Sequence, residues 1–355
     1  MKKYWSRRIR DMVPYVPGEQ PKDRIFIKLN TNENPYPPSE KALMAIQAAA
    51  DERLRLYPAP GCEDLRQAIA QHHGLLPDQV FPGNGSDEVL AFCFQAFFDP
   101  DRTVLFPDIT YSFYPVYANF FDLAYHEIPL RDNFDLPVTP FCGRNGGVVI
   151  ANPNAPTGKS VGLENIRTIL DANPEAVVLV DEAYVDFGGI SAISLISEYD
   201  NLVVVRTLSK SHSLAGLRVG YALGNPNLIA ALCCVRDSIN SYTLDRVAQA
   251  GAAAAIRDES YFLETVEKVI HTRDRCSEEL KRMGFIVPES SANFIFISHP
   301  ALPATKLMDG LRKKGILVRH FDRPRISNYL RVSIGTDQEM DALCAALEKL
   351  LESGD

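Results

Sequence analysis

The chain has 355 residues and a mass of 39.5 kDa, and its 46% apolar and 23% charged residues are those of a globular protein, which excludes wholesale disorder. Its 37 Lys and Arg against 45 Asp and Glu give a formal charge of −8, which argues against nucleic acid or an anionic membrane as the main partner because both need a basic face. No apolar run is long enough to cross a bilayer, and Pro14 and Pro17 stand where a signal peptide needs an apolar core, so we expect a cytoplasmic protein of two or three structural units.

The first part of the chain, residues 1–35, is rich in proline and predicts an irregular or extended arm. Helical patterns follow at 39–50 and 63–72, and a third helix is predicted to begin at Ser86. Short, continuous β-branched runs then alternate with helical segments, which is typical of a mainly parallel sheet covered by helices on both faces. These runs are 103–106, 147–151, 177–180, 202–205 and 218–223.

The pattern changes near residue 240. A long helix is predicted at 259–283, and two strands alternate with two helices after it, at 293–297, 304–314, 329–334 and 337–351. This order predicts a separate, smaller α+β unit. We therefore expect an α/β protein with an arm over 1–35, a large domain with a mostly parallel, seven-stranded type of sheet over 36–240, and a small domain over 241–355.

Cysteine and histidine do not form the groupings that bind metals. The seven cysteines are scattered without a Cys-x-x-Cys pair, and no two histidines stand at a ligand spacing on one helix. We expect buried free thiols in a reducing compartment and no metal.

The strongest local signal surrounds a lysine. Lys210 follows the apolar run 202–205 and is flanked by Thr207 and Ser209, with Arg218 eight residues later. Open α/β sheets place ligands at the carboxyl ends of strands, and hydroxyl groups with a fixed guanidinium suit a phosphate. A lysine beside a bound phosphate suggests an amine that forms a Schiff base with a carbonyl group. The competing interpretation is an ordinary solvated lysine.

A carboxylate ends a second apolar run. Asp181 follows 177–180, and burying its charge there costs several kcal/mol unless a cation or a hydrogen-bond donor meets it. A protonated pyridine nitrogen would meet it and would keep the ring an electron sink. Asp is also a favoured helix N-cap, and the residues alone leave the two interpretations equal.

Three weaker signals complete the set. The turn 83–88 contains two glycines and begins a helix, where free N–H groups can bind an anion. The segment 152–158, with sequence Asn-Pro-Asn-Ala-Pro-Thr-Gly, predicts a rigid corner after a strand. Tyr111 could cover a flat ring, although simple packing explains an isolated tyrosine as well.

The order of these motifs resembles that of the fold-type I, pyridoxal-phosphate-dependent aminotransferases over nearly the whole chain. Asn32-Glu33-Asn34-Pro35 near the start and the segment 330–335 near the end belong to the resemblance. Within the family the chain is most similar to the histidinol-phosphate aminotransferases, on Val13-Pro14-Tyr15, Leu56-Tyr57-Pro58, the run 206–210, and the paired segments 315–319 and 329–331.

The resemblance implies a cofactor, pyridoxal 5'-phosphate, and roles for single residues. Lys210 resembles the lysine that forms the Schiff base and moves the proton, Asp181 the partner of the pyridine nitrogen, and Tyr184 a donor to the ring 3-oxygen. Tyr111 resembles the aromatic residue that stacks on the ring. The remaining matches form a phosphate cup, Gly85, Ser86, Asp87, Thr207, Ser209 and Arg218, and a substrate group, Tyr15, Asn32, Arg319 and Arg331.

Tyr57 resembles a residue that reaches the cofactor phosphate of the neighbouring subunit. The resemblance therefore implies a homodimer with shared active sites, in which Tyr15 also crosses the interface. One departure stands out. The family has Asn before Pro-Thr-Gly, bonded to the ring 3-oxygen, and this chain has Ala155. The contact is either lost or supplied by Asn152 or Asn154.

Two arginines bear on the substrate. The family's counterpart of Arg331 holds an α-carboxylate, and Arg319, twelve residues earlier, would suit a phosphate dianion unless it is a surface cation. The resemblance thus implies transamination between histidinol phosphate and 2-oxoglutarate, giving imidazole acetol phosphate and glutamate in histidine biosynthesis. The alternatives are an aromatic amino-acid aminotransferase, a threonine-phosphate decarboxylase, and a non-catalytic ligand-binding homologue, which the intact Lys210, Asp181 and Arg218 disfavour.

Overall fold

The computed structural model describes residues 2–10, 12–16, 18–21 and 24–353. The predicted arm over 1–35 therefore includes residues 1, 11, 17, 22 and 23, and the predicted small domain includes 354 and 355, that lie outside the described residues. The described part of the arm is irregular except for one helical turn, α1 (Arg7–Arg10), and a two-residue strand, β1 (Ile27–Lys28).

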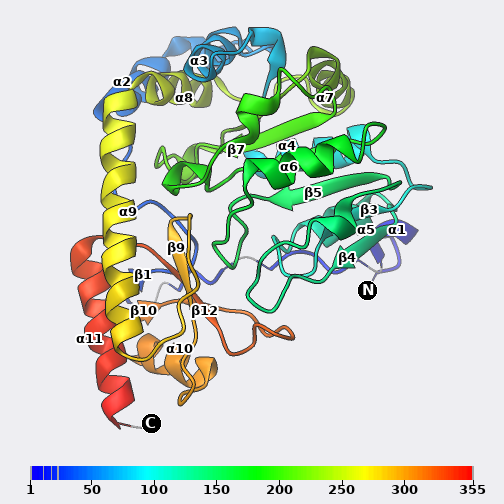
Figure 1. The fold of residues 1–355 in the computed structure, drawn as a ribbon. Coiled ribbons are helices and arrows are strands. Elements are labelled where there is room, and N and C mark those ends of the chain that lie inside the picture. Colours follow the sequence, from blue (N-terminus) through cyan, green and yellow to red (C-terminus); the bar gives the residue numbers. More distant parts are fainter. Residues whose placement is uncertain (1, 11, 17, 22–23, 354–355) are drawn as a thin grey trace.

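A seven-stranded sheet forms the centre of the larger unit (Figure 1). Its strand order is β2-β8-β7-β6-β5-β3-β4, with β8 antiparallel to both neighbours and the other pairs parallel. The connection from β7 to β8 holds only one short 3-10 turn and no crossover helix, so the chain returns antiparallel. The strands are β2 (Val80–Gly83), β3 (Val104–Pro107), β4 (Tyr125–Ile128), β5 (Gly147–Ala151), β6 (Val178–Asp181), β7 (Leu202–Thr207) and β8 (Gly220–Gly224).

Helices cover both faces of this sheet, because alternate strand residues point to opposite sides. Val148 and Val178 belong to the core cluster of α3, α6 and α8, whereas Val149 and Leu179 belong to that of α4, α5 and α7. The helices are α2 (Glu40–Ala49), α3 (Glu63–His73), α4 (Ser86–Phe97), α5 (Tyr114–Phe120), α6 (Leu163–Asp171), α7 (Pro226–Ile239) and α8 (Arg246–Arg257). The prediction of a mostly parallel sheet covered on both faces is confirmed.

The smaller unit has its own core and two small sheets. Strands β11, β12 and β9 are antiparallel, and β1 from the arm pairs in parallel with β10. Leu29, just after β1, lies in the core cluster of this unit. Its elements are α9 (Glu259–Arg282), β9 (Phe294–Ile297), α10 (Ala304–Lys313), β10 (Ile316–Leu317), β11 (Arg319–His320), β12 (Leu330–Ser333) and α11 (Asp337–Ser353).

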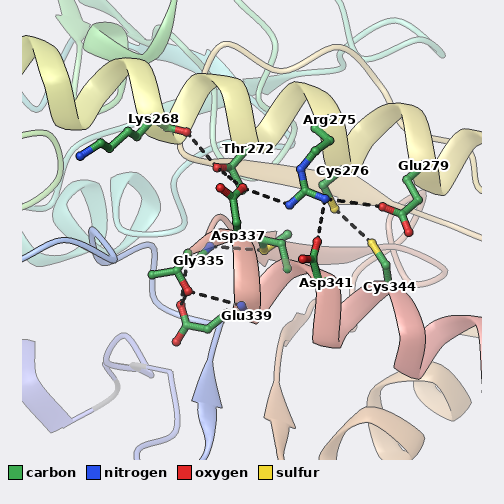
Figure 2. A network of polar contacts seen from close by, with 12 residues as sticks. Lys268, Thr272, Arg275, Cys276, Glu279, Gly335, Asp337, Glu339, Asp341 and Cys344 are labelled. Carbon is green, nitrogen blue, oxygen red and sulfur yellow. Dashed lines mark hydrogen bonds and ion pairs between the residues drawn. The ribbon is translucent and has the colours of Figure 1, made fainter.

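Polar and thiol contacts join α9 to α11 (Figure 2). The guanidinium of Arg275 lies 3.0 Å from Asp337 and 2.6 Å from Asp341, and the Thr272 hydroxyl donates to Asp337 at 2.9 Å. Below them the buried thiols of Cys276 and Cys344 lie 3.6 Å apart. Because these ion pairs are partly exposed, each contributes about 0.2–1 kcal/mol.

The core of the larger unit includes residues beyond position 240. Helix α8 packs on α2 and α3, and its residues up to Ile256 belong to the core cluster of the large sheet. After α8, the next buried residue of the other cluster is Val266 in α9. We therefore propose that the large unit extends through α8, because the alanine-rich face of that helix is buried against the large core and not against the small one. Within the described residues, no helix combines the length and apolar character needed to span a membrane.

Candidate active site

A cavity of about 210 Å³ lies at the carboxyl ends of β5, β6 and β7, where both units and the arm meet. Open α/β sheets bind ligands at this edge. Of the site residues that the sequence predicts, all but Gly85 and Tyr57 line this cavity. Residues from the arm, from the large sheet and from β11 and β12 therefore converge on one space.

Lys210 lies in the loop that follows β7, and its amine is half-buried in the cavity. Its Nζ donates to the carbonyl of Thr31 at 3.3 Å and lies 5.7 Å from the centre of the Tyr184 ring. The loop itself is held from outside, because the side-chain amide of Asn34 donates to the carbonyl oxygens of Lys210 at 3.0 Å and Ser211 at 3.3 Å. The amine is thus free to face a ligand while its backbone is fixed.

Asp181 is a buried carboxylate at the end of β6. Its Oδ2 accepts a hydrogen bond from the Tyr114 hydroxyl at 2.8 Å and its Oδ1 accepts one from the Ala183 N–H at 3.2 Å. Burial, together with the charges of Asp87 and Glu182, raises the pKa of this carboxyl to about 6. Asp181 thus makes the capping contact with Ala183 and also lines the cavity. A cationic N–H group in the cavity could donate to its carboxylate.

The start of α4 forms one end of the cavity. Gly85 precedes the helix with a φ of +84°, and a Cβ at this residue would lie 2.5 Å from Nη2 of Arg218. Arg218 also pairs with Asp87 at 3.1 Å, and its Nη1 lies 3.4 Å from the Ser209 hydroxyl. Free helix N–H groups, hydroxyls and a guanidinium in one place are what a phosphate group requires.

Tyr111 borders the same end of the cavity. Its hydroxyl donates to Asp87 at 2.9 Å, and its ring lies edge-on to the ring of Tyr114, with the centroids 5.7 Å apart. Burial raises the pKa of Tyr111 well above its usual value, with the Asp87 charge adding to the effect. The phenol therefore stays neutral and acts as a donor to Asp87.

Two paired arginines, Arg319 and Arg331, also line the cavity. Arg319 on β11 is directly paired with Arg331 on β12 in the antiparallel ladder. Arg331 donates to the Asn30 carbonyl at 3.0 Å, while its buried Nε has no partner among the described residues. Burial lowers the pKa of Arg331, and the nearby charge of Arg319 lowers it further. Because Arg319 lines the cavity, its position fits a binding role better than the surface role that its sequence context allows.

The two tyrosines that the sequence assigns to a neighbouring subunit differ in position. Tyr15 lies in the cavity of its own chain, where its ring stacks on Phe113 at 4.6 Å. Tyr15 thus lines the cavity of its own chain here, and its predicted contact with the site of a partner subunit stays a prediction. Tyr57 lies outside the cavity, 78% exposed, and stacks on Tyr242 at 4.5 Å.

The contacts of Asn152 and Asn154 bear on whether either residue replaces the asparagine that is missing at Ala155. Both side-chain groups of Asn152 bond to the backbone of Val161, at 2.8 and 3.1 Å. The amide of Asn154 is likewise occupied, by Ile109, Thr110 and Thr157. Because both side chains bond to the protein, the structure favours the interpretation that the contact expected at the position of Ala155 is lost.

Four residues of the site escape the sequence-based prediction. Tyr114 stands in the aromatic segment from which only Tyr111 was chosen, and nothing local distinguishes a tyrosine that reaches Asp181 across the sheet. Asn30, Thr31 and Asn34 contact Arg331 and Lys210, which lie far away in the sequence. Their proximity to Asn32 is the signal that could have found them.

The chain matches the family model described as "Aminotransferase class I and II" over residues 24–347. It is 58% identical to a histidinol-phosphate aminotransferase of Clostridium acetobutylicum over 340 residues, which cover 96% of this chain and 97% of that protein. It is 53% identical to a histidinol-phosphate aminotransferase of Acinetobacter baylyi over 349 residues, 98% of this chain and 97% of that protein.

Solved structures give the same picture of the fold. A histidinol-phosphate aminotransferase from Sinorhizobium meliloti in complex with pyridoxal-5'-phosphate superposes with a TM-score of 0.83 at 26% identity, covering 93% of this chain and 92% of that one. An aminotransferase from Staphylococcus aureus superposes with a TM-score of 0.87 at 21% identity, covering 99% and 100%.

Proposed function

This chain belongs to the class I and II aminotransferase family, and on that basis we propose that its cavity transfers the amino group of histidinol phosphate to 2-oxoglutarate. The products are imidazole acetol phosphate and glutamate, and the reaction is a step of histidine biosynthesis. The observation that carries the proposal is that the paired Arg319 and Arg331 line the same cavity as Lys210 and the phosphate-binding start of α4. One cavity thus offers two groups of residues that suit anions, together with an amine.

The cofactor is pyridoxal 5'-phosphate, and the residues present fit it. The helix start with Ser86 and Arg218 suits its phosphate, and Asp181 suits its ring nitrogen, because a buried carboxylate without a cation is stabilised by an N⁺–H group. Tyr111 and Tyr184 border the space for the ring. When bound, the cofactor supplies an aldehyde to hold the amine and an aromatic ring that accepts electrons.

Each side chain then has one task. The Lys210 amine takes a proton from one carbon atom and returns it to another during the transfer of the amino group, because a neutral amine can accept and donate a proton. Asn34 fixes the backbone from which it acts. Asp181 keeps its negative charge beside the ring nitrogen. Tyr184 donates its hydroxyl proton into the cavity, and Tyr111 covers the ring while remaining neutral.

Substrate selection is assigned to the arginine pair. Within the described part of the chain, the Arg331 guanidinium donates one hydrogen bond, to the Asn30 carbonyl, and so has further N–H groups for an anion. A phosphate dianion uses both Arg319 and Arg331, whereas the carboxylate of glutamate is smaller and carries a single charge. Both substrates can therefore alternate in one pocket.

The proposal is tested by comparing Arg331→Ala with Arg319→Ala in single-turnover measurements of each half-reaction. Each charge-assisted contact is worth about 1.5–3 kcal/mol, so losing one should cost roughly ten- to hundredfold. We expect Arg331→Ala to weaken both half-reactions and Arg319→Ala to penalise histidinol phosphate more than glutamate. Equal losses on both substrates in both variants would contradict the assignment of the phosphate to the pair.

We also propose a homodimer in which the active sites are shared. Leu54, Leu56 and Tyr57 are exposed, and Tyr57 stacks on Tyr242, which is also exposed. Exposed apolar clusters of this kind mark protein contacts. Tyr57 reaches no group of its own cavity and is free to contact a neighbour's cofactor phosphate. A cytoplasmic location is proposed with it, because all seven cysteines are free thiols, as in proteins of reducing compartments.

A further inference from the structure

The hydroxyl of Tyr184 already has a hydrogen-bond partner in the cavity. The side-chain amide nitrogen of Asn32 lies 3.1 Å from the Tyr184 oxygen. An amide NH₂ group can only donate, so the Tyr184 oxygen accepts this bond. The phenol proton of Tyr184 is therefore left for a different acceptor, on the side of the cavity that Tyr184 lines.

The orientation of the Asn32 amide follows from its other contacts. The backbone N–H of Asn32 donates to the Ser333 oxygen at 2.8 Å, and the Ser333 hydroxyl proton goes back to Oδ1 of Asn32 at 2.9 Å. Ser333 is 2% exposed. If the amide were rotated by 180°, its NH₂ group would face Ser333, and the buried Ser333 hydroxyl proton would lose its acceptor. The oxygen of the amide thus faces Ser333, and its nitrogen faces Tyr184.

Asn32 is also fixed in its backbone. It is 1% exposed and has a φ of +56°, a left-handed conformation that asparagine adopts more readily than most residues. Its carbonyl accepts a hydrogen bond from the Asn293 side chain at 3.0 Å. The residues that direct Tyr184 therefore come from the smaller unit and from the segment after β1, whereas Tyr184 itself follows β6 of the large sheet.

The contact between Asn32 and Tyr184 lies near Ala155, where this chain lacks a hydrogen-bond donor that the family has. The family places an asparagine before Pro-Thr-Gly, and here Ala155 packs against Tyr184 within a small apolar cluster. Asn152 and Asn154 are bonded elsewhere. With that donor absent, contact to the ring oxygen of the cofactor depends on the direction in which the Tyr184 proton points.

We propose that Asn32 and Ser333 are positioning residues that fix Tyr184 as a hydrogen-bond donor into the cavity, in place of the donor lost at Ala155. The acceptor is the 3-oxygen of the bound cofactor, so the inference rests on the proposed function. Asn32, which the family resemblance assigns to the substrate, acts here through Tyr184. Because its amide donates to the Tyr184 oxygen, Tyr184 is the donor in the hydrogen bond between Tyr184 and the ligand.

The test is a double-mutant cycle read by two quantities other than turnover: the dissociation constant of pyridoxal 5'-phosphate and the pH midpoint of the visible absorbance of the bound cofactor. Asn32→Ala should weaken binding about three- to tenfold and shift the midpoint in the same direction as Tyr184→Phe, but less. In the Tyr184→Phe background, Asn32→Ala should add less than about twofold, because the group through which it acts is gone.

Asn32→Asp makes the test sharper, since it has the same size and replaces a donor by an acceptor. The phenol would then donate to Asp and turn away from the cofactor, so this variant should be worse than Asn32→Ala. Ala155→Asn, which supplies a donor directly, should recover part of the loss in Asn32→Ala. Asn34→Ala is the matched control, because it contacts the Lys210 loop and should keep its full effect in the Tyr184→Phe background.

Additive effects of Asn32→Ala and Tyr184→Phe, or an Asn32→Asp variant no worse than Asn32→Ala, would overturn the proposal. Should Asn32→Ala fail to fold, Ser333→Ala carries the same cycle, with a smaller expected shift in the same direction. These results are separable from the proposed function. A wild-type protein that transaminates histidinol phosphate but gives an additive cycle disproves only the positioning role, whereas a wild type that binds no cofactor disproves the function itself.

Discussion

The buried carboxyl group of Asp181 accepts two hydrogen bonds but has no cationic partner among the described residues. Its two donors, the Tyr114 hydroxyl and the Ala183 N–H, lower its pKa, yet burial outweighs them and the pKa rises to about 6 from 3.8. Because the folded-state pKa is raised, the cofactor-free protein is more stable with Asp181 protonated and loses that stability as the pH rises through about 6. A ligand cation that pairs with the carboxylate removes this penalty.

Asp181→Asn should therefore separate binding from folding. The amide cannot stabilise a protonated ring nitrogen, so we expect a loss of turnover of two orders of magnitude or more. The melting temperature of the cofactor-free protein at pH 7 should stay the same or rise, because the buried charge is gone and Asn is an equally good cap. Thermal unfolding and turnover measured side by side check this, and an unchanged rate would sink the cofactor role of Asp181.

Tyr114→Phe removes one of the two donors to the Asp181 carboxylate. A hydrogen bond to a charged group is worth about 1.5–3 kcal/mol, so cofactor affinity at pH 7 should fall roughly tenfold or more as the Asp181 pKa rises. The decline in affinity toward low pH, centred near 6 in the wild type, should move to higher pH. Tyr117→Phe, whose hydroxyl contacts the backbone of Asp87, serves as the control. A pH profile identical to that of the wild type would show that Tyr114 only fills space.

At the scale of elements, hydrophobic patterning predicted those strands and helices that have continuous, buried apolar residues. Strand β5 lies at the predicted residues, and helices α2, α3, α9 and α10 differ from prediction by at most one residue at each end. Strand β2 was missed because Pro82 and Gly83 interrupt its pattern, and β4 because His126 and Glu127 are exposed at the edge of the sheet. Strands β1, β10 and β11 have two residues each and depend on tertiary pairing, which no local pattern encodes.

The candidate site divides in the same way. Lys210, Asp181 and Arg218 stand in ordered motifs beside strand ends, so sequence reasoning reaches them. Tyr114 and Asn34 act through contacts with residues more than sixty positions away, and their roles emerge only when the chain is folded. Local sequence carries the chemistry of single groups, whereas the orientation of those groups is a property of the fold.

The start of α4 gives a prediction at this scale. Gly85→Ala should weaken cofactor binding strongly, because its Cβ would lie 2.5 Å from the Arg218 guanidinium and its φ is +84°. Gly74→Ala is a matched control, since Gly74 also has a positive φ, +66°, but ends α3 with open space around it. Both variants should lose about 1 kcal/mol of stability from the backbone, and only Gly85→Ala should lose affinity for pyridoxal phosphate. Equal affinities in the two variants would contradict the close approach of Arg218.

At the scale of the whole molecule, the segment from Asn30 to Asn34 ties the parts together. It follows β1, which pairs in the smaller unit, and it contacts Arg331 of that unit, Tyr184 after β6 and Lys210 after β7. A change in the relative position of the two units would therefore alter the contacts of the Lys210 amine and of Arg331 directly.

The proposed dimer gives a prediction of subunit complementation. Mixing Tyr57→Phe protein with Lys210→Ala protein should create one normal site per mixed dimer, because the intact Lys210 of one subunit meets the intact Tyr57 of the other. Cofactor affinity and turnover of the mixture would then exceed the average of the parents once subunit exchange is established by labelling. A mixture that only averages the parents would show that each site uses its own Tyr57.

The most direct test of the central claim is the single-turnover rate of the wild-type protein with histidinol phosphate, histidinol, phenylalanine, tyrosine and threonine phosphate. If Arg319 and Arg331 bind a phosphate dianion, histidinol phosphate should react fastest, and removing its phosphate should cost about a hundredfold or more. A faster reaction with phenylalanine or tyrosine, or the release of carbon dioxide from threonine phosphate, would contradict the account.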